Sequence, residues 1–73
     1  MMTPQVAMNI IASAIFRKPT KEDKKEWKFK SKTAKIGYDE DGDWIVILDN
    51  GEATIVEMDD HWYREYKFNL STI

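Results

Sequence analysis

The chain has 73 residues, of which 42% are apolar and 33% charged, with no cysteine and a net charge of −2. This composition excludes a disulfide scaffold, a cysteine-ligated zinc site, a low-complexity chain and a second domain of ordinary size. It predicts one small folded domain, because large apolar side chains are numerous enough to offset the entropy of ordering the chain. No apolar run approaches the ~18 residues of a membrane span, so we expect no membrane association. The lack of cysteine is compatible with the cytoplasm, which is the location we expect.

Charge is unevenly distributed along the sequence. Residues 1–16 carry no charged side chain, residues 17–37 hold nine basic and three acidic ones, and residues 38–73 hold two basic and ten acidic ones. Such segregation can orient an encounter with a charged partner, provided that folding does not interleave the two regions and cancel their fields.

Residues 4–17 are predicted to form a helix. Thr3 can accept a hydrogen bond from an unpaired backbone N–H, and Pro4 suits the first helical turn because its φ is already helical. Apolar residues then recur at spacings of three to five. Lys18 stands before a proline, which pushes it out of the helical conformation, so the helix is expected to end at about residue 17.

A basic linker, residues 18–25, follows the helix, and within it Thr20 to Asp23 has the form of a capping box for a single helical turn. From Trp27 to Thr33, aromatic and hydroxyl side chains alternate with lysines, which predicts a half-buried strand with a cationic outer face. The alternation shifts by one residue near Thr33, where we expect a bulge or tight turn.

Two hairpins follow, so that a β-meander extends over about residues 26–70. Asp41-Gly42 and Asn50-Gly51 are pairs that favour tight turns with positive φ. If both turns are two-residue loops, Tyr38 lies opposite Ile45, and Ile36 lies opposite Ile47. The side chains expected on the other face of the sheet are Trp44, Val46, Leu48, Ala53 and Ile55. A last strand with one apolar face is formed by Trp62, Tyr66, Phe68 and Leu70.

The middle strand, residues 44–48, is apolar on both faces. A helix over residues 4–17 is about 20 Å long and covers only one of them. Either the sheet bends strongly, up to closure into a small barrel, or a second chain covers the other face. The predicted fold is therefore α+β: an N-terminal helix followed by a strongly bent four- to five-stranded antiparallel meander. A homodimer through the uncovered face is the alternative.

The sequence holds no recognisable catalytic or metal-binding constellation, so we expect no enzyme activity, no metal and no cofactor. His61 is the single histidine, and no serine has a base at a recognisable spacing. The acidic run from Asp39 to Asp43 fails as an EF-hand loop, because its glycine is fourth instead of sixth and its twelfth residue is Asn50 instead of Glu. We interpret this run as a solvated acidic turn.

The acidic half of the chain leads to our primary functional prediction. Carboxylates cluster at two turns near an outward-facing aromatic side chain, and such a surface can dock on a basic surface of another protein. The protein is therefore predicted to be a non-enzymatic binding module, such as a small regulator or inhibitor of a larger protein. The candidate docking residues are Asp39, Asp41, Asp59, Asp60 and Tyr63.

The lysine-rich segment, residues 24–35, gives a first alternative. Lysines interleaved with aromatic residues hold single-stranded nucleic acid in many small barrels. The candidate residues are Lys28, Lys30 and Lys32, although the pI near 5.3 is unlike that of typical nucleic-acid-binding domains. A homo-oligomeric structural subunit is the second alternative, because a chain this small is often completed by a partner.

Overall fold

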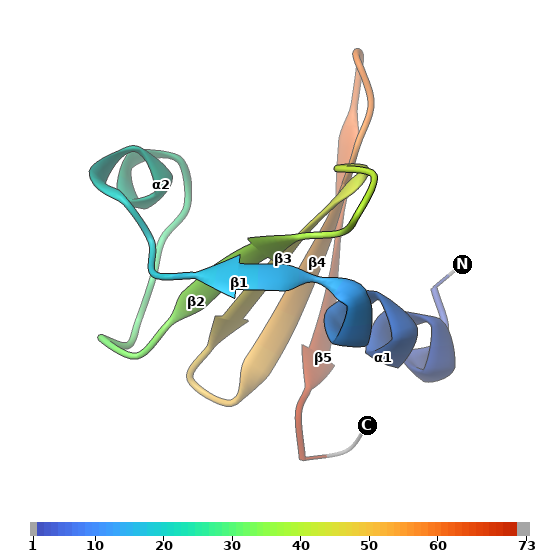
Figure 1. The fold of residues 1–73 in the computed structure, drawn as a ribbon, viewed down its shortest axis with the longest axis horizontal. Helices are drawn as coiled ribbons and strands as arrows, with labels where there is room; N and C mark the ends of the chain where they lie inside the picture. Colours follow the sequence, from blue (N-terminus) through green and yellow to red (C-terminus); the bar gives the residue numbers. More distant parts are fainter. Residues whose placement is uncertain (1, 72–73) are drawn as a thin grey trace.

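The structure is a computed structural model that describes residues 2–71. Its strands form one antiparallel sheet in the order β1-β2-β3-β4-β5, and Figure 1 shows β1 lying between the two helices. The α+β prediction is confirmed, but the sheet is open and not closed into a barrel. The elements are α1 (Pro4–Ser13), β1 (Ile15–Arg17), α2 (Lys21–Glu26), β2 (Lys35–Tyr38), β3 (Trp44–Asp49), β4 (Glu52–Met58) and β5 (Tyr63–Asn69).

Helix α1 begins as predicted and ends earlier than predicted. Thr3 Oγ1 accepts a hydrogen bond from the N–H of Val6 at 3.2 Å, and a proline follows at the first helical position. The helix ends at Ser13, and Ala14 is already extended. Residues 15–17, which we predicted to be helical, instead form β1 and pair with β2. The prediction fails there because helix propensity is a weak preference that strand pairing overrides.

The capping box that opens α2 is present as predicted. The N–H of Asp23 donates to Thr20 Oγ1 at 3.2 Å, and the N–H of Thr20 donates to the Asp23 carboxylate at 2.8 Å. The predicted strand at Trp27 to Thr33 is wrong, because no strand forms between Glu26 and Lys35. Aromatic residues here are half-buried and the lysines between them exposed. In a segment that lies across a sheet face, buried and exposed side chains alternate in the same way as in a strand, although the backbone does not hydrogen-bond to a neighbouring strand.

This connection between β1 and β2, residues 18–34, helps to cover the second face of the sheet. On that face, Ile36 and Val56 are fully buried and Ile47 is 6% exposed. Trp27 lies beside Ile47 around a small hollow over the sheet. The apolar middle strand is therefore shielded there from within the chain, a solution that neither the barrel nor the second-chain hypothesis had included.

The β3–β4 turn has the predicted geometry. Asn50 and Gly51 have φ values of 53° and 77°, and Asp49 pairs with Glu52 across a two-residue loop. Positive φ at both central residues matches the twist of the flanking strands, which is why this pair of residues specifies the hairpin.

The β2–β3 turn keeps the predicted register but not the predicted loop. Tyr38 pairs with Ile45, as expected. Two hydrogen bonds between Asp39 and Trp44 close the loop. The N–H of Asp39 donates to the carbonyl of Trp44 at 3.3 Å, and the N–H of Trp44 donates to Asp39 Oδ1 at 2.9 Å. Only Gly42 has a positive φ in this loop, at 74°. Four residues therefore form the turn instead of two.

The main core lies between α1 and the sheet. Ala7, Val46 and Ile55 are fully buried at its centre. The small side chain of Ala7 lets the helix approach the strands closely. Trp62, expected on the apolar face of the last strand, is 46% exposed, and the guanidinium of Arg64 lies 5.5 Å from the centre of its ring. The partly buried residues around the centre are Met2, Ile10, Ile11, Ala14, Phe16, Trp44, Leu48 and Phe68.

The fold keeps the two charged regions of the sequence apart. Loops 39–43 and 59–62 both lie at one end of the sheet, because they close hairpins that open in the same direction (Figure 1). The connection 18–34 leaves the sheet after Arg17 and returns at Lys35, at the end that holds the β3–β4 turn. The acidic loops and the lysine-rich connection therefore lie toward opposite ends, and the charge asymmetry of the sequence persists in the structure.

Candidate functional site

The two loops at one end of the sheet, 39–43 and 59–62, form an acidic end. The structure brings four of the predicted docking residues together there, and Tyr63 follows directly on the second loop. Asp39 is half-buried and the other carboxylates of the two loops are exposed. The carboxylates are those of Asp39, Glu40, Asp41, Asp43, Asp59 and Asp60.

Two of these carboxylates shape their own loops. Asp39 Oδ1 accepts the N–H of Trp44, as described above, and Asp59 Oδ1 accepts the N–H of His61 at 3.4 Å. Asp41 and Asp60 lie exposed at the loop tips. Of the predicted set, Asp41 and Asp60 are therefore the carboxylates best placed to meet a partner.

Three aspartates of the first loop approach one another. Carboxylate oxygens of Asp39, Asp41 and Asp43 lie within 4.8 Å of one another. Exposed acidic groups gather in this way in many turns, and Asp39 is already engaged in closing the loop. We therefore treat the cluster as part of the negative charge of the acidic end.

An exposed apolar patch adjoins the acidic end on the sheet face opposite α1. Cross-strand pairs join Ile15 to Tyr38, Tyr38 to Ile45, and Met58 to Tyr63. Ile15 is 74% exposed, Tyr63 65%, Met58 50% and Tyr38 37%, while Ile45 is half-buried. Single exposed apolar residues are ordinary, but neighbouring ones on one sheet face are typical of interaction sites. The apolar patch consists of Ile15, Tyr38, Ile45, Met58 and Tyr63.

Sequence reasoning identified Tyr63 in this patch and missed its other four members as site residues, although it did place Tyr38 opposite Ile45. Ile15 was assigned to the helix, where its neighbours on β2 could not be foreseen. Met58 could have been found, because it stands two residues after Val56 on the same strand and shares its face.

A lysine groove lies on the connection 18–34. Its volume is about 680 Å³, and none of the described residues around it is acidic. Lys28, Lys30 and Lys32, the predicted nucleic-acid-binding residues, all line it. Lys24, the first residue of the predicted lysine-rich segment, also lines it, and so does Lys18, which lies outside that segment. The remaining lining residues are Pro19, Phe29, Ser31 and Ala34.

One wall of the lysine groove is held by Asp49 of β3. Its carboxylate accepts the N–H of Lys30 at 2.6 Å and the N–H of Ser31 at 2.9 Å. Ser31 Oγ in turn accepts the N–H of Thr33 at 3.1 Å. The backbone of the segment that carries the predicted lysines is thus attached to the sheet.

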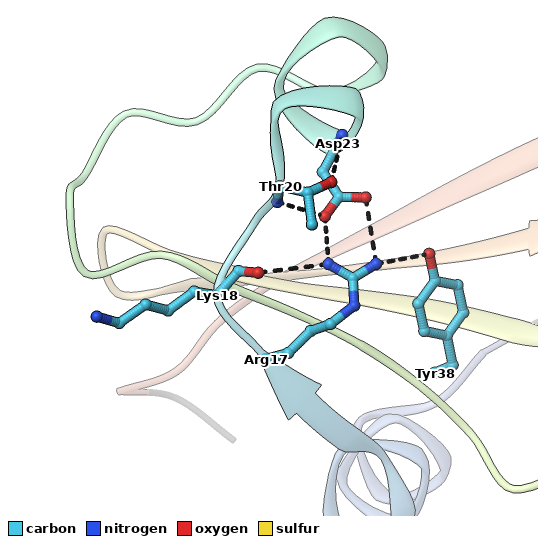
Figure 2. Close-up of polar contacts among 5 residues, drawn as sticks. All are labelled: Arg17, Lys18, Thr20, Asp23 and Tyr38. Atoms are coloured by element: carbon cyan, nitrogen blue, oxygen red, sulfur yellow. Dashed lines mark hydrogen bonds and ion pairs between the residues drawn. The ribbon is translucent and has the colours of Figure 1, made fainter.

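The other side is held by an ion pair between Arg17 and Asp23 (Figure 2). The guanidinium of Arg17 also donates to Tyr38 Oη at 3.4 Å and to the carbonyl of Lys18 at 3.3 Å. The hydrogen bond from Arg17, helped by the N–H of Thr20, lowers the pKa of Asp23 to about 2. The same pair raises the pKa of Arg17. Asp23 is therefore ionised throughout the physiological pH range.

Comparisons with known protein families, curated proteins and solved structures found no match. Within residues 2–71, no helix combines the length and the apolar character that crossing a bilayer requires. The features from which a function can be inferred are therefore the acidic end with its apolar patch, and the lysine groove.

Proposed function

We propose that this protein is a non-enzymatic binding module that docks on a larger protein through the apolar patch and the acidic end. Protein interfaces commonly combine an apolar centre with a polar or charged rim. Here the patch supplies two tyrosines, a methionine and two isoleucines, and the two loops supply charge beside it. Tyrosine and methionine are enriched in such centres. A role as a small regulator or inhibitor is consistent with extents of 32 × 30 × 19 Å.

The observation that carries this proposal is the sign of the charge beside the patch. A partner with a basic border around an apolar centre gains both burial and attraction, and the attraction speeds the encounter. A two-fold dimer through the same patch would instead bring the acidic loops of both copies to the border of one interface, where like charges repel. The patch therefore favours a different, basic protein over a second copy of this chain.

Tyr63 is the side chain expected to contribute most to docking. It is 65% exposed, it lies in the patch beside Met58, and it follows directly on the loop that holds Asp60. A large aromatic ring at such a position gains much contact area at little cost in side-chain entropy.

Quantitative affinity capture tests the proposal. Wild-type protein, the Tyr63→Ala variant and an Asp41→Lys, Asp60→Lys variant are compared on the same extract. A Lys21→Glu, Lys25→Glu variant, altered on α2 at the opposite end, is the matched control. We expect a basic protein to be retained by wild type and control, and to be lost about tenfold or more with Tyr63→Ala. Circular dichroism verifies that each variant is folded.

Two outcomes would contradict the proposal. In one, every retained protein binds the Tyr63→Ala variant and the Asp41→Lys, Asp60→Lys variant as tightly as it binds the wild type. In the other, sedimentation reveals a stable dimer that Tyr63→Ala dissociates, which would assign the patch to a second copy. The cytoplasmic location remains a prediction, which microscopy of the tagged chain in its native cells would test.

A further inference from the structure

The lysine groove presents a feature that the docking proposal does not explain. Five lysines surround one hollow of about 680 Å³, a size within the usual range of ligand sites. Positive side chains gathered around one hollow attract an anion, and their mutual repulsion decreases when it binds among them. Within the described chain, no carboxylate lines the groove itself. Lys28 and Lys30 also line the small neighbouring hollow over the sheet, which Asp49, Glu52 and Glu65 share.

Two carboxylates beside the groove are engaged in holding its walls. Asp49 accepts two backbone N–H groups of the lysine segment. Asp23 is paired with Arg17 and with the N–H of Thr20. Neither residue lines the groove. The charged residues that line the groove are therefore all positive, and the backbone that carries them is attached to the sheet by Asp49 and, through Asp23, to Arg17.

The arrangement of the lysines fits a chain of phosphates better than a single anion. Lys28, Lys30 and Lys32 alternate with half-buried residues, so their exposed side chains follow one another along the segment. Phe29 lies between the first two, is half-buried and lines the same groove, and aromatic side chains in such grooves are the ones on which bases stack. A repeated anion with flat bases between its charges is the chemistry of a single-stranded nucleic acid.

We propose that the lysine groove binds the phosphate backbone of single-stranded nucleic acid, with a base against Phe29. Lysine ammonium groups attract phosphates without the two-pronged base contacts that arginine makes, and Arg17 is occupied by Asp23. Binding is therefore expected to show little sequence preference. Contact with about three to five phosphates gives a log–log salt slope of about −2 to −3.5 for a single strand. The acidic end, at the other end of the sheet, keeps the groove oriented toward the polyanion.

Fluorescence anisotropy with labelled dodecamers of deoxythymidine and of uridine tests this proposal. The wild type is compared with a Lys28→Glu, Lys32→Glu variant at low and moderate salt. The control is Lys21→Glu, Lys25→Glu, which changes the net charge equally at exposed positions outside the groove. We expect the groove variant to weaken binding at least about tenfold and the control to change it less than about threefold. Tyr63→Ala should bind the oligonucleotides as wild type does, so failure here and failure of protein docking are distinguishable.

A second comparison distinguishes the stacking of bases on Phe29 from the attraction of lysines to phosphate charge alone. Phe29→Leu retains an apolar side chain but loses the stacking surface, so it should weaken oligonucleotide binding while leaving binding of inorganic polyphosphate unchanged. Three outcomes would overturn the proposal: no oligonucleotide binding at low salt, equal losses in the groove and control variants, or polyphosphate bound as tightly as the oligonucleotides with no effect of Phe29→Leu.

Discussion

Arg17 donates hydrogen bonds to both carboxylate oxygens of Asp23, and this pair attaches α2 to the edge strand β1. Asp23 also accepts the N–H of Thr20, so one carboxylate joins the start of the helix to the end of the strand. The connection 18–34 is thereby directed over the sheet, which places the lysine groove.

The Arg17–Asp23 pair predicts a loss of stability in acid. The folded-state pKa of Asp23 is about 2, below its usual value of 3.8. Because the pKa is lower in the folded state, the contribution of ionised Asp23 to the free energy of unfolding is complete above about pH 4 and is lost as the pH falls toward 2. Thermal unfolding of wild type and Asp23→Asn across this range should show wild type more stable at pH 6, with the difference shrinking below pH 4. A difference independent of pH would contradict the role given to this carboxylate.

Gly37 is predicted to tolerate no side chain. It pairs with Phe16, and a Cβ there would lie 2.7 Å from Phe16 Cδ1 and 2.8 Å from the backbone oxygen of Ile15. Gly37→Ala should lower the free energy of unfolding by about 1–3 kcal/mol, because the backbone oxygen can yield only if β1 moves. Urea unfolding measures this. Adding Phe16→Leu should leave most of the loss in place, and a Gly37→Ala variant as stable as wild type would refute the clash.

Asp49 is predicted to slow hydrogen exchange at backbone amides of the lysine-rich segment. Removing its carboxylate in Asp49→Ala leaves the N–H groups of Lys30 and Ser31 without their acceptor, at a cost of about 1–2 kcal/mol. Hydrogen exchange at these two amides should accelerate, while that of Ile36 in β2 changes only with global stability. Asp49→Asn, whose single carbonyl oxygen can still accept, should be intermediate. Unchanged exchange at both amides would argue against this attachment.

The core between α1 and the sheet predicts a contrast between two isoleucines. Ile55 is fully buried, so Ile55→Val should cost about 0.5–1.5 kcal/mol of unfolding free energy. Ile15 is 74% exposed, so Ile15→Val should change stability by less than about 0.5 kcal/mol. Both variants remove one methylene group, which makes them a matched pair in urea unfolding. Equal losses at the two positions would mean that Ile15 is covered.

Features specified by neighbouring residues were predictable from the sequence. The N-cap of α1, the capping box of α2 and the Asn50-Gly51 turn each depend on residues within four positions of one another. The strand register and the two faces of β3 followed from the turns and the period-two pattern. For the same reason, the acidic loops and the outward position of Tyr63 could be predicted.

The cover of the second sheet face could be decided only by the tertiary structure. Residues 15–17 are a strand because they meet β2 some twenty residues later, and a local helical pattern cannot report that pairing. From Trp27 onward, half-buried residues alternate with lysines. This pattern is the same for a strand and for a segment lying across a sheet, because it reflects side-chain burial and not backbone hydrogen bonding.

Charge and local geometry were therefore determined by the sequence itself, and the assembly of surfaces was not. The sequence placed lysines at 28, 30 and 32, but only the path of the connection brings Lys18 and Lys24 to the same groove. It placed Tyr63 outward, but only the pairing of β1 with β2 adds Ile15 to the same patch. The apolar patch joins residues distant along the chain, and the lysine groove depends on how the connection 18–34 folds back on itself, so neither surface follows from local sequence alone.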